Sequence, residues 1–210
     1  MPLPDLAAFF VPGSVYRWTD GTPFEVEVLD AGRLELTTGN VVATDPAWPA
    51  LDDAVAAVVQ PGSYPVSLSV ARSRSAPERA LVSAVRMLVS EGQVESWAPA
   101  WQRLTSEGTP KALGFTVDAG EACLLDQAAL PFLIDLADDE EASIELSLRV
   151  NREMFEHVVD EATGMNVIVF ACGMGDGTYP VWSGSTTEGE VAQVVVDLEF
   201  LSRCIRCGEP

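Results

Sequence analysis

Apolar and polar residues alternate over short stretches in the first half of the chain. Residues 24–28 read Phe-Glu-Val-Glu-Val, and residues 34–37 read Leu-Glu-Leu-Thr. A period of two is typical of a strand that buries one face. Turn-forming pairs separate these stretches, including Asp20-Gly21 and Ala31-Gly32. We therefore predict an antiparallel meander of short strands joined by tight turns between residues 14 and 45.

Apolar segments of strand length, bounded by turn residues, continue through the rest of the chain. Strands are expected at residues 64–71, 94–97, 113–117, 166–171, 179–183 and 191–200, the last two forming an antiparallel pair. Residues 50–59 are apolar and rich in Ala, so they fit either a short helix or a strand. Residues 104–111 are predicted to form a loop.

We predict three helices, two of which show the apolar stripe of period 3.6 residues that is typical of an amphipathic helix. The first covers residues 76–90, and the capping-box sequence Ser-Ala-Pro-Glu lies at its start. The second occupies part of residues 127–137, and the third covers residues 152–162, capped by Asn151. The combined pattern predicts an α+β fold, with a mainly antiparallel, sandwich-like β-sheet and about three helices.

Length and composition fit one globular domain. The chain has 210 residues, of which 48% are apolar and 21% are charged. We expect a single domain over residues 1–210, with a flexible C-terminal tail over residues 201–210. No apolar run approaches the roughly 18 residues that a membrane span requires, and so we expect no membrane partner.

The balance of charge excludes several classes of function. Asp and Glu total 32 against 12 Lys and Arg, which gives a formal net charge of −20. Clustered cations are needed to bind a phosphate backbone, so we expect no nucleic-acid partner. The chain has one His, His157, which excludes a site built from several histidines. We expect His157 on the polar side of the third helix, exposed to solvent.

Cysteine content and the N-terminal sequence favour a cytoplasmic protein. Four Cys in 210 residues are too few for a disulfide framework, and Cys123 and Cys172 lie in apolar segments. The chain begins without a basic segment or a signal-type cleavage site. The excess of Arg over Lys, together with abundant Ala and Val, is typical of a GC-rich bacterial genome.

One five-residue phrase occurs twice. Gly62-Ser63-Tyr64-Pro65-Val66 returns as Gly177-Thr178-Tyr179-Pro180-Val181. Proline removes a backbone donor, so both copies are expected near strand starts or on an edge. The phrase indicates either two similar turns or two equivalent strands that face one cleft, with Tyr64 and Tyr179 at its rim.

An ordered set of motifs resembles a known bacterial family. The set contains Ala43-Thr44-Asp45-Pro46, Pro61–Val66, Gly114–Gly120 with Cys123 and Asp126, Asn166–Phe170, and Gly173–Trp182. Over roughly residues 15–200 the chain resembles domain-of-unknown-function family 4241. Where this family has Ser-Gly-Trp-Gly-Asp-Gly, the chain has Cys172-Gly-Met-Gly-Asp-Gly177. The resemblance implies a shared fold and assigns no chemistry.

Several carboxylates lie beside turn residues at strand ends. Clustered carboxylates bind divalent cations or act as an acid–base pair, although Asp is also the ordinary turn residue. The candidate ligand cleft comprises Asp45, Tyr64, Asp118, Asp126, Asp176, Tyr179 and Trp182. No catalytic residue, metal ligand or cofactor is assigned. The five Trp residues are expected in the core or in a cleft wall.

Two further motifs are weaker. The glycine-rich segment Gly173–Gly177 precedes no helix and lacks a Walker-type Lys, so a tight turn is favoured over a phosphate site. Cys204 and Cys207 form a CxxC pair, which supplies only two of the four ligands of a zinc site. A terminal tail and a metal bridge between two chains both fit this pair.

Two functions of different classes remain open, and the sequence does not decide whether the protein is an enzyme. The first is a non-catalytic binding module whose acidity steers a basic protein partner, as in immunity proteins and nucleic-acid mimics. The second is an Asp-cluster hydrolase, with or without a metal ion, near the Gly-Asp-Gly-x-Tyr-Pro turn. The sequence does not predict an oligomeric state.

Overall fold

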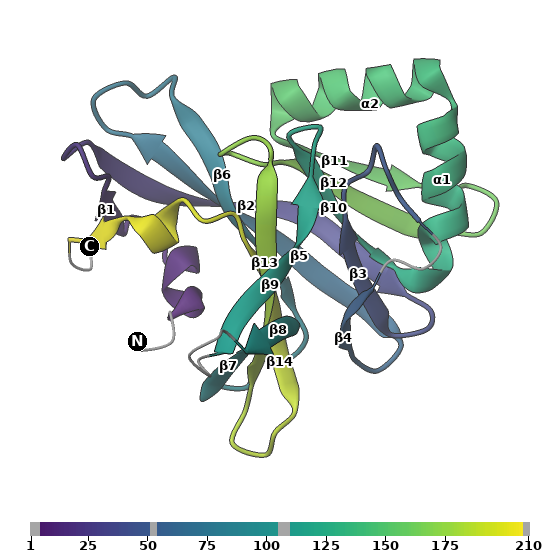
Figure 1. Cartoon of the computed structure of the whole chain (residues 1–210), viewed down its shortest axis with the longest axis horizontal. Helices are drawn as coiled ribbons and strands as arrows, with labels where there is room; N and C mark the ends of the chain where they lie inside the picture. Colours follow the sequence, from purple (N-terminus) through teal and green to yellow (C-terminus); the bar gives the residue numbers. More distant parts are fainter. Residues whose placement is uncertain (1–4, 51–53, 105–109, 208–210) are drawn as a thin grey trace.

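Antiparallel strands make up most of the computed structural model, which describes residues 5–50, 54–104 and 110–207 (Figure 1). The larger sheet contains ten of the described strands, in the order β15-β1-β2-β5-β6-β14-β13-β9-β8, with β7 paired to β13. Their bounds are β1 Val15–Arg17, β2 Pro23–Leu36, β5 Gly62–Ser73, β6 Ala80–Leu88, β7 Ser96–Pro99, β8 Trp101–Leu104, β9 Pro110–Val117, β13 Gly177–Ser185, β14 Val191–Asp197 and β15 Ile205–Arg206.

The smaller sheet contains five of the described strands, in the order β11-β12-β10-β3-β4. Their bounds are β3 Asn40–Thr44, β4 Val55–Val58, β10 Glu121–Asp126, β11 Phe155–Val159 and β12 Asn166–Ala171. Every pairing within both sheets is antiparallel. The prediction of a mainly antiparallel α+β fold is therefore confirmed.

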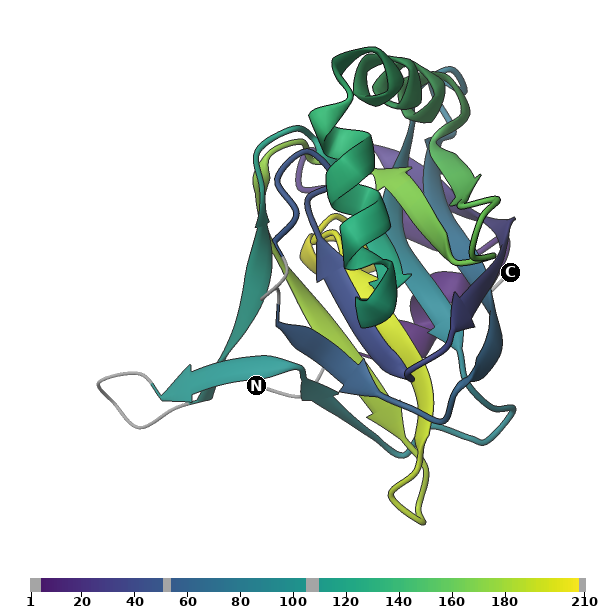
Figure 2. The ribbon, with the colours of Figure 1, turned by 90° about the vertical axis from the view of Figure 1, so that its right-hand side faces the viewer.

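The helices α1 (Leu130–Asp138) and α2 (Glu140–Glu153) cover one face of the smaller sheet (Figure 2). Alternate residues of β10 contact different layers. Leu124 belongs to the core between the two sheets, whereas Cys123 and Leu125 pack under the helices. Because both faces of this sheet are buried, its central strands are apolar at almost every position.

A third core lies on the opposite face of the larger sheet. Short 3-10 turns at Leu6–Phe10 and Leu201–Arg203 bury Phe9, Phe10 and Leu201 against that face. The fold therefore consists of four layers: the 3-10 turns, the larger sheet, the smaller sheet and the two α-helices.

The helix expected at residues 76–90 is wrong, because residues 80–88 form β6. This strand lies inside the larger sheet, between β5 and β14. Val85 and Met87 contact the core between the sheets, and Leu81 and Ala84 pack on the outer core. A strand with two buried faces loses the alternation of period two, so its apolar residues also fit a helical stripe.

The helix expected at residues 152–162 is also wrong, because residues 155–159 form β11. The second helix lies earlier, in α2, where the Asp139 carboxylate caps the N-terminus by accepting from Ala142 N at 3.1 Å. Only Leu146 and Val150 of α2 are buried. Two residues make an apolar stripe too narrow to recognise in the sequence. The helix within residues 127–137 is confirmed by α1. The described residues thus contain two α-helices rather than about three.

The strands expected at residues 24–28 and 34–37 are one strand, β2. The pair Ala31-Gly32 does not turn the chain but forms a bulge, where the pairing with β5 shifts between Asp30 and Arg33. Gly32 has φ +89°, which a glycine adopts without strain. Residues 55–58 form β4, which resolves the choice between helix and strand for the described part of residues 50–59.

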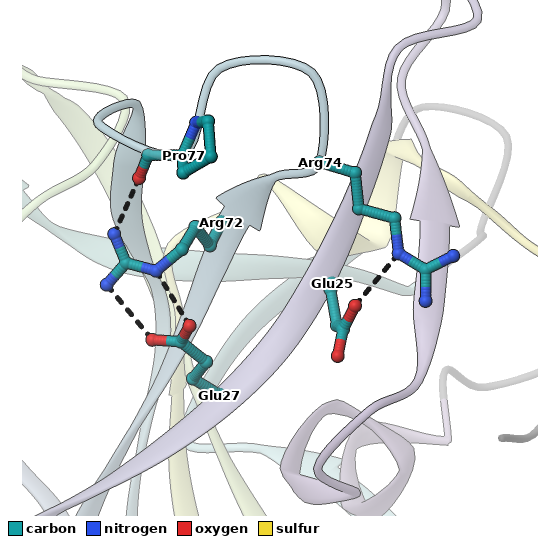
Figure 3. Close-up of polar contacts among 5 residues, drawn as sticks. All are labelled: Glu25, Glu27, Arg72, Arg74 and Pro77. Atoms are coloured by element: carbon teal, nitrogen blue, oxygen red, sulfur yellow. Dashed lines mark hydrogen bonds and ion pairs between the residues drawn. The ribbon is translucent and has the colours of Figure 1, made fainter.

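Cross-strand ion pairs link β2 to β5 (Figure 3). Arg72 donates to both carboxylate oxygens of Glu27, at 2.7 and 3.0 Å, and to the carbonyl oxygen of Pro77 at 2.7 Å. Arg74 Nε lies 2.8 Å from Glu25 Oε2. These pairs are partly exposed, so each stabilises the fold only modestly, by about 0–1 kcal/mol.

The last described residues pack on the domain. Leu201 is buried, and β15 pairs with β1 through Ile205 and Arg206. Residues 208–210 of the expected tail lie outside the described residues, and the flexibility of the tail stays a prediction. Among the described helices, none is long and apolar enough to cross a membrane.

Candidate functional site

A pocket of about 520 Å³ lies where the end of β3 meets β8 and β9. We call it the aromatic pocket; its lining residues are Ala43, Thr44, Asp45, Trp48, Ala54, Trp101, Leu113, Gly114, Phe115, Thr116 and Asp118. Strand β3 belongs to the smaller sheet, whereas β8 and β9 belong to the larger one. The pocket therefore lies at the junction of the two sheets, beside the extended β8–β9 pair seen in Figure 2.

Aromatic side chains from three segments form the pocket wall. Trp48 follows β3 and is 72% exposed, which is unusual for the largest apolar side chain. Trp101 comes from β8, and Phe115 comes from β9. Tryptophan is enriched among the residues that contribute most to protein–protein binding, so this wall is a candidate binding surface.

Gly114 allows β9 to approach β13 closely at the back of this wall. A Cβ atom at Gly114 would lie 2.1 Å from the carbonyl oxygen of Tyr179, a distance that real atoms do not reach. Gly114 is paired with Pro180 across the two strands. A residue larger than glycine would not fit at position 114, the first residue of the motif Gly114–Gly120. The close approach of β9 to β13 at this point also positions Phe115.

Asp45 lies inside the pocket wall and is only 4% exposed. Its Oδ2 accepts from Asp118 N at 2.7 Å and from Ala119 N at 3.2 Å, and its Oδ1 accepts from Ala47 N at 2.8 Å. The carboxylate thus joins the segment after β3 to the β9–β10 turn. Both carboxylate oxygens accept from backbone amides, so the role of Asp45 is to fix the shape of the pocket rather than to bind a ligand in it.

Asp118 and Asp176 lie at neighbouring strand ends. Val117 and Gly177 form the last pair between β9 and β13, and the two aspartates occupy the next position on each side. Both side chains are exposed. Asp118 lines the pocket rim. This is the one pair of predicted carboxylates that the fold brings together with both members facing solvent.

Asp126 lies at the far end of β10 and outside the pocket. Its carboxylate is fully buried and accepts from Thr38 N, Thr38 Oγ1, Gly39 N and Ala128 N at 2.8–3.2 Å. These bonds hold the β2–β3 turn and begin the 3-10 turn before α1. The four candidate aspartates therefore do not form one cluster.

The repeated phrase forms the same local structure twice. Tyr64 donates its hydroxyl to the carbonyl oxygen of Gln60 at 2.6 Å, and Tyr179 donates to that of Gly175 at 2.6 Å. In each copy the tyrosine closes the turn that precedes its strand. The strands β5 and β13 are not neighbours, because β6 and β14 lie between them and β13 runs antiparallel to β5. The phrase is thus a repeated turn and does not build one shared rim.

Tyr179 and Trp182 belong to the core rather than to the pocket. Burial raises the pKa of Tyr179 to about 12. Trp182 packs on the outer face of the larger sheet, and its buried indole nitrogen has no hydrogen-bond partner among the described residues. A ligand-binding role for Tyr64, Tyr179 and Trp182 stays a prediction.

Cys123 and His157, two other reactive side chains, also lie outside the aromatic pocket. Cys123 is fully buried under the helices, as expected. His157 lies in β11, where its Nε2 is 2.6 Å from Asn166 Nδ2, so it belongs to no helix. Within residues 5–50, 54–104 and 110–207, no three His, Cys, Asp or Glu side chains group as metal ligands.

Sequence reasoning did not single out Leu113 and Phe115 as site residues. The signal was present, because both occupy alternate positions of the expected strand 113–117 and so share one face. Trp48 and Trp101 were expected in the core or a cleft wall. The pocket itself depends on segments that lie about 50 to 70 positions apart in the chain.

The observed layers and pocket define a mainly antiparallel α+β domain with an open aromatic site between two sheets. Residues 34–196 match the family described as "Protein of unknown function (DUF4241)", and the chain belongs to this family. The matched segment includes every lining residue of the aromatic pocket. The resemblance found in the sequence motifs is therefore confirmed. No curated protein and no solved structure matches the chain.

Proposed function

We propose that this protein is a non-catalytic binding module that receives an Arg or Lys side chain of a basic protein partner in the aromatic pocket. The observation that carries the proposal is the exposed indole of Trp48 in a pocket whose rim bears the Asp118 carboxylate. Immunity proteins and nucleic-acid mimics are acidic binding proteins of this general kind.

The chemistry of the pocket suits a side chain that is apolar along its stem and cationic at its end. Trp48, Trp101 and Phe115 offer faces on which a guanidinium group stacks. The stem of Arg or Lys covers apolar surface while its head reaches polar groups. Asp118 supplies the anion at the rim, and Asp176 lies beside it.

The charge of the whole chain supports a basic partner. The formal net charge is −20, because Asp and Glu total 32 against 12 Lys and Arg. Most carboxylates are therefore uncompensated. A field of one sign accelerates the approach of an oppositely charged partner and weakens as salt screens it.

The alternative, an Asp-cluster hydrolase, has less support. Asp45 and Asp126 give their carboxylate oxygens to backbone amides, and Asp126 lies at the far end of β10. Asp118 and Asp176 remain as an exposed pair. A hydrolase would need these two to act together on a substrate in the aromatic pocket.

Selection from a random peptide library tests the proposal without knowledge of the natural partner. Peptides that bind the intact protein are expected to be basic, with Arg or Lys next to an apolar residue. Trp48→Ala is expected to weaken the selected peptides by about tenfold or more, as for a hot-spot residue. Because Trp48 is largely exposed, this variant is expected to fold.

A matched pair of variants separates the pocket from general acidity. Asp118→Asn and Asp138→Asn each remove one negative charge, but only Asp118 lines the aromatic pocket. The first is expected to increase the dissociation rate, and the second to lower only the association rate at low salt. Selection of neutral or acidic peptides, or equal binding by Trp48→Ala, would overturn the proposal. Hydrolysis abolished by Asp118→Asn or Asp176→Asn would favour the alternative.

A further inference from the structure

A second pocket, of about 210 Å³, lies between the two α-helices and the turns that follow β3 and β9. We call it the Glu121 pocket; its lining residues are Pro46, Ala47, Ala119, Glu121, Leu136, Ala137, Ser143, Ile144, Leu146 and Ser147. The segments joined by Asp45 therefore line the aromatic pocket on one side and the Glu121 pocket on the other.

Glu121 is the single charged side chain among these lining residues, and it is only 5% exposed. Its Oε1 accepts from Ser147 Oγ at 2.7 Å and from Asn151 Nδ2 at 3.2 Å. Its Oε2 accepts no hydrogen bond from any residue that the structure describes, and Glu121 takes part in none of the described ion pairs. A carboxylate oxygen without a hydrogen-bond partner inside the described chain can accept one from a ligand in the pocket.

The surroundings of the pocket favour a cation. Burial raises the pKa of Glu121, and the neighbouring Asp45 carboxylate acts in the same direction, so a positive charge beside Glu121 would stabilise its ionised form. Ile144 lines both the Glu121 pocket and the surface formed by Asp138, Asp139, Glu140 and Glu141. The mouth therefore lies next to the acidic junction of the two helices, which attracts cations.

We infer that the Glu121 pocket binds a primary ammonium group carried on a short apolar stem. An ammonium group has three donors. Three oxygens of the pocket match them: Glu121 Oε2 and the hydroxyls of Ser143 and Ser147. The side chains of Leu136, Ile144 and Leu146 would contact the stem. A divalent metal would need about six oxygen ligands, more than this set supplies.

This inference is independent of the proposed function, because it concerns a different pocket and a small amine tests it. The probe is n-butylammonium, titrated into the full chain labelled with ¹⁵N. Saturable shifts are expected for the amides of residues 119–121 and 143–147. n-Butanol has a stem of equal length without the charge and is expected to give no saturable shift.

Two variants of equal charge supply the matched control. Glu121→Gln is expected to weaken butylammonium binding by about tenfold or more, because it removes the charge from the hydrogen bond. Glu140→Gln removes one charge from the exposed start of α2 and is expected to change the affinity less than twofold. If Glu121→Gln fails to fold, Ser143→Leu fills the mouth of the pocket with Glu121 intact and is expected to abolish binding.

A second probe identifies the source of the amine. Nα-acetyl-lysine N-methylamide presents the same ammonium as part of a peptide. Tighter binding of this probe than of butylammonium assigns the pocket to a lysine of a protein, and the reverse order assigns it to a free alkylamine. Absence of saturable shifts, or identical titrations for the intact protein and Glu121→Gln, would overturn the inference.

Discussion

Buried carboxylates organise the backbone of this protein at the scale of single residues. Asp45 and Asp126 each accept at least three hydrogen bonds from other residues and take part in none of the ion pairs among the described residues. Aspartate suits this task because its short side chain holds two acceptors close to the backbone. The same property explains why a list of turn aspartates resembles a catalytic cluster.

Removal of the Asp45 carboxylate is expected to destabilise the fold. Asp45→Ala leaves three backbone N–H groups without their acceptor, those of Ala47, Asp118 and Ala119. The free energy of unfolding is expected to fall by about 2–3 kcal/mol, as measured by urea denaturation. Asp176→Ala is the control, because its carboxylate is exposed; the expected change is within about 0.5 kcal/mol. Equal stability of the two variants would contradict this role for Asp45.

Asp197 introduces a pH dependence of stability. It is buried at the end of β14, and this burial raises its pKa to about 6, although Glu199 N and Ser202 Oγ donate to its Oδ1. The unfolded chain has an ordinary Asp pKa of about 3.9. The folded protein therefore binds more protons between about pH 4 and about pH 6, and its stability decreases as the pH rises through this window.

The variant Asp197→Asn isolates this contribution from the other acids. Relative to the variant, the intact protein is expected to lose up to about 3 kcal/mol of unfolding free energy between about pH 4 and about pH 7. Urea denaturation of both proteins across this range measures the difference. A difference that does not vary with pH would show that Asp197 has an unshifted pKa.

At the scale of secondary-structure elements, strand β15 determines whether Cys204 and Cys207 can form a disulfide. Ile205 and Arg206 pair with β1, so the chain is extended between Cys204 and Cys207. Three extended residues span about 10 Å, whereas a disulfide needs Cα atoms within about 7 Å. The paired strand therefore keeps the two thiols apart.

Alkylation by iodoacetamide is expected to follow exposure and thiolate character. Cys207 is exposed and reacts first; Cys204 is partly buried and its pKa is raised to about 11, so it reacts more slowly. Cys123 and Cys172 are buried and react only on unfolding. Trypsin separates Cys204 from Cys207 by cleavage after Arg206, so mass spectrometry resolves both rates. An internal Cys204–Cys207 disulfide in the folded protein would contradict the pairing of β15.

Uncompensated negative charge is the main property at the scale of the whole molecule. Carboxylates outnumber cations by 32 to 12, and the acidic junction at Asp138–Glu141 places four of them next to one another. Repulsion between like charges destabilises the compact state, and salt reduces it.

Salt is therefore expected to stabilise this protein. The melting temperature is expected to rise by about 2–6 °C between low ionic strength and about 0.5 M NaCl. The double variant Glu140→Gln/Glu141→Gln relieves part of the repulsion, so its melting temperature is expected to respond less to salt. Gel retardation of DNA or RNA at about 0.15 M salt is not expected. Tight nucleic-acid binding would contradict the electrostatic interpretation.

The sequence by itself determined those features that depend on local patterns. Strands with one polar face, such as the first half of β2, carry the alternation of period two, and the segment that forms α1 is predominantly apolar. The ordered motifs also assigned the chain to its family. The excess of acidic residues is a property of composition and needs no structure.

Tertiary structure alone decided the features that depend on burial from two sides or on distant contacts. Strand β6 is apolar on both faces because one face contacts the core between the sheets and the other contacts the outer core, and so its pattern fits a helix equally well. Asp45 became a structural anchor because the amides of Asp118 and Ala119, more than 70 positions later, lie within reach of its carboxylate. Both pockets are formed by segments that are distant in the sequence, and a local pattern of apolar residues does not predict which distant segments come into contact.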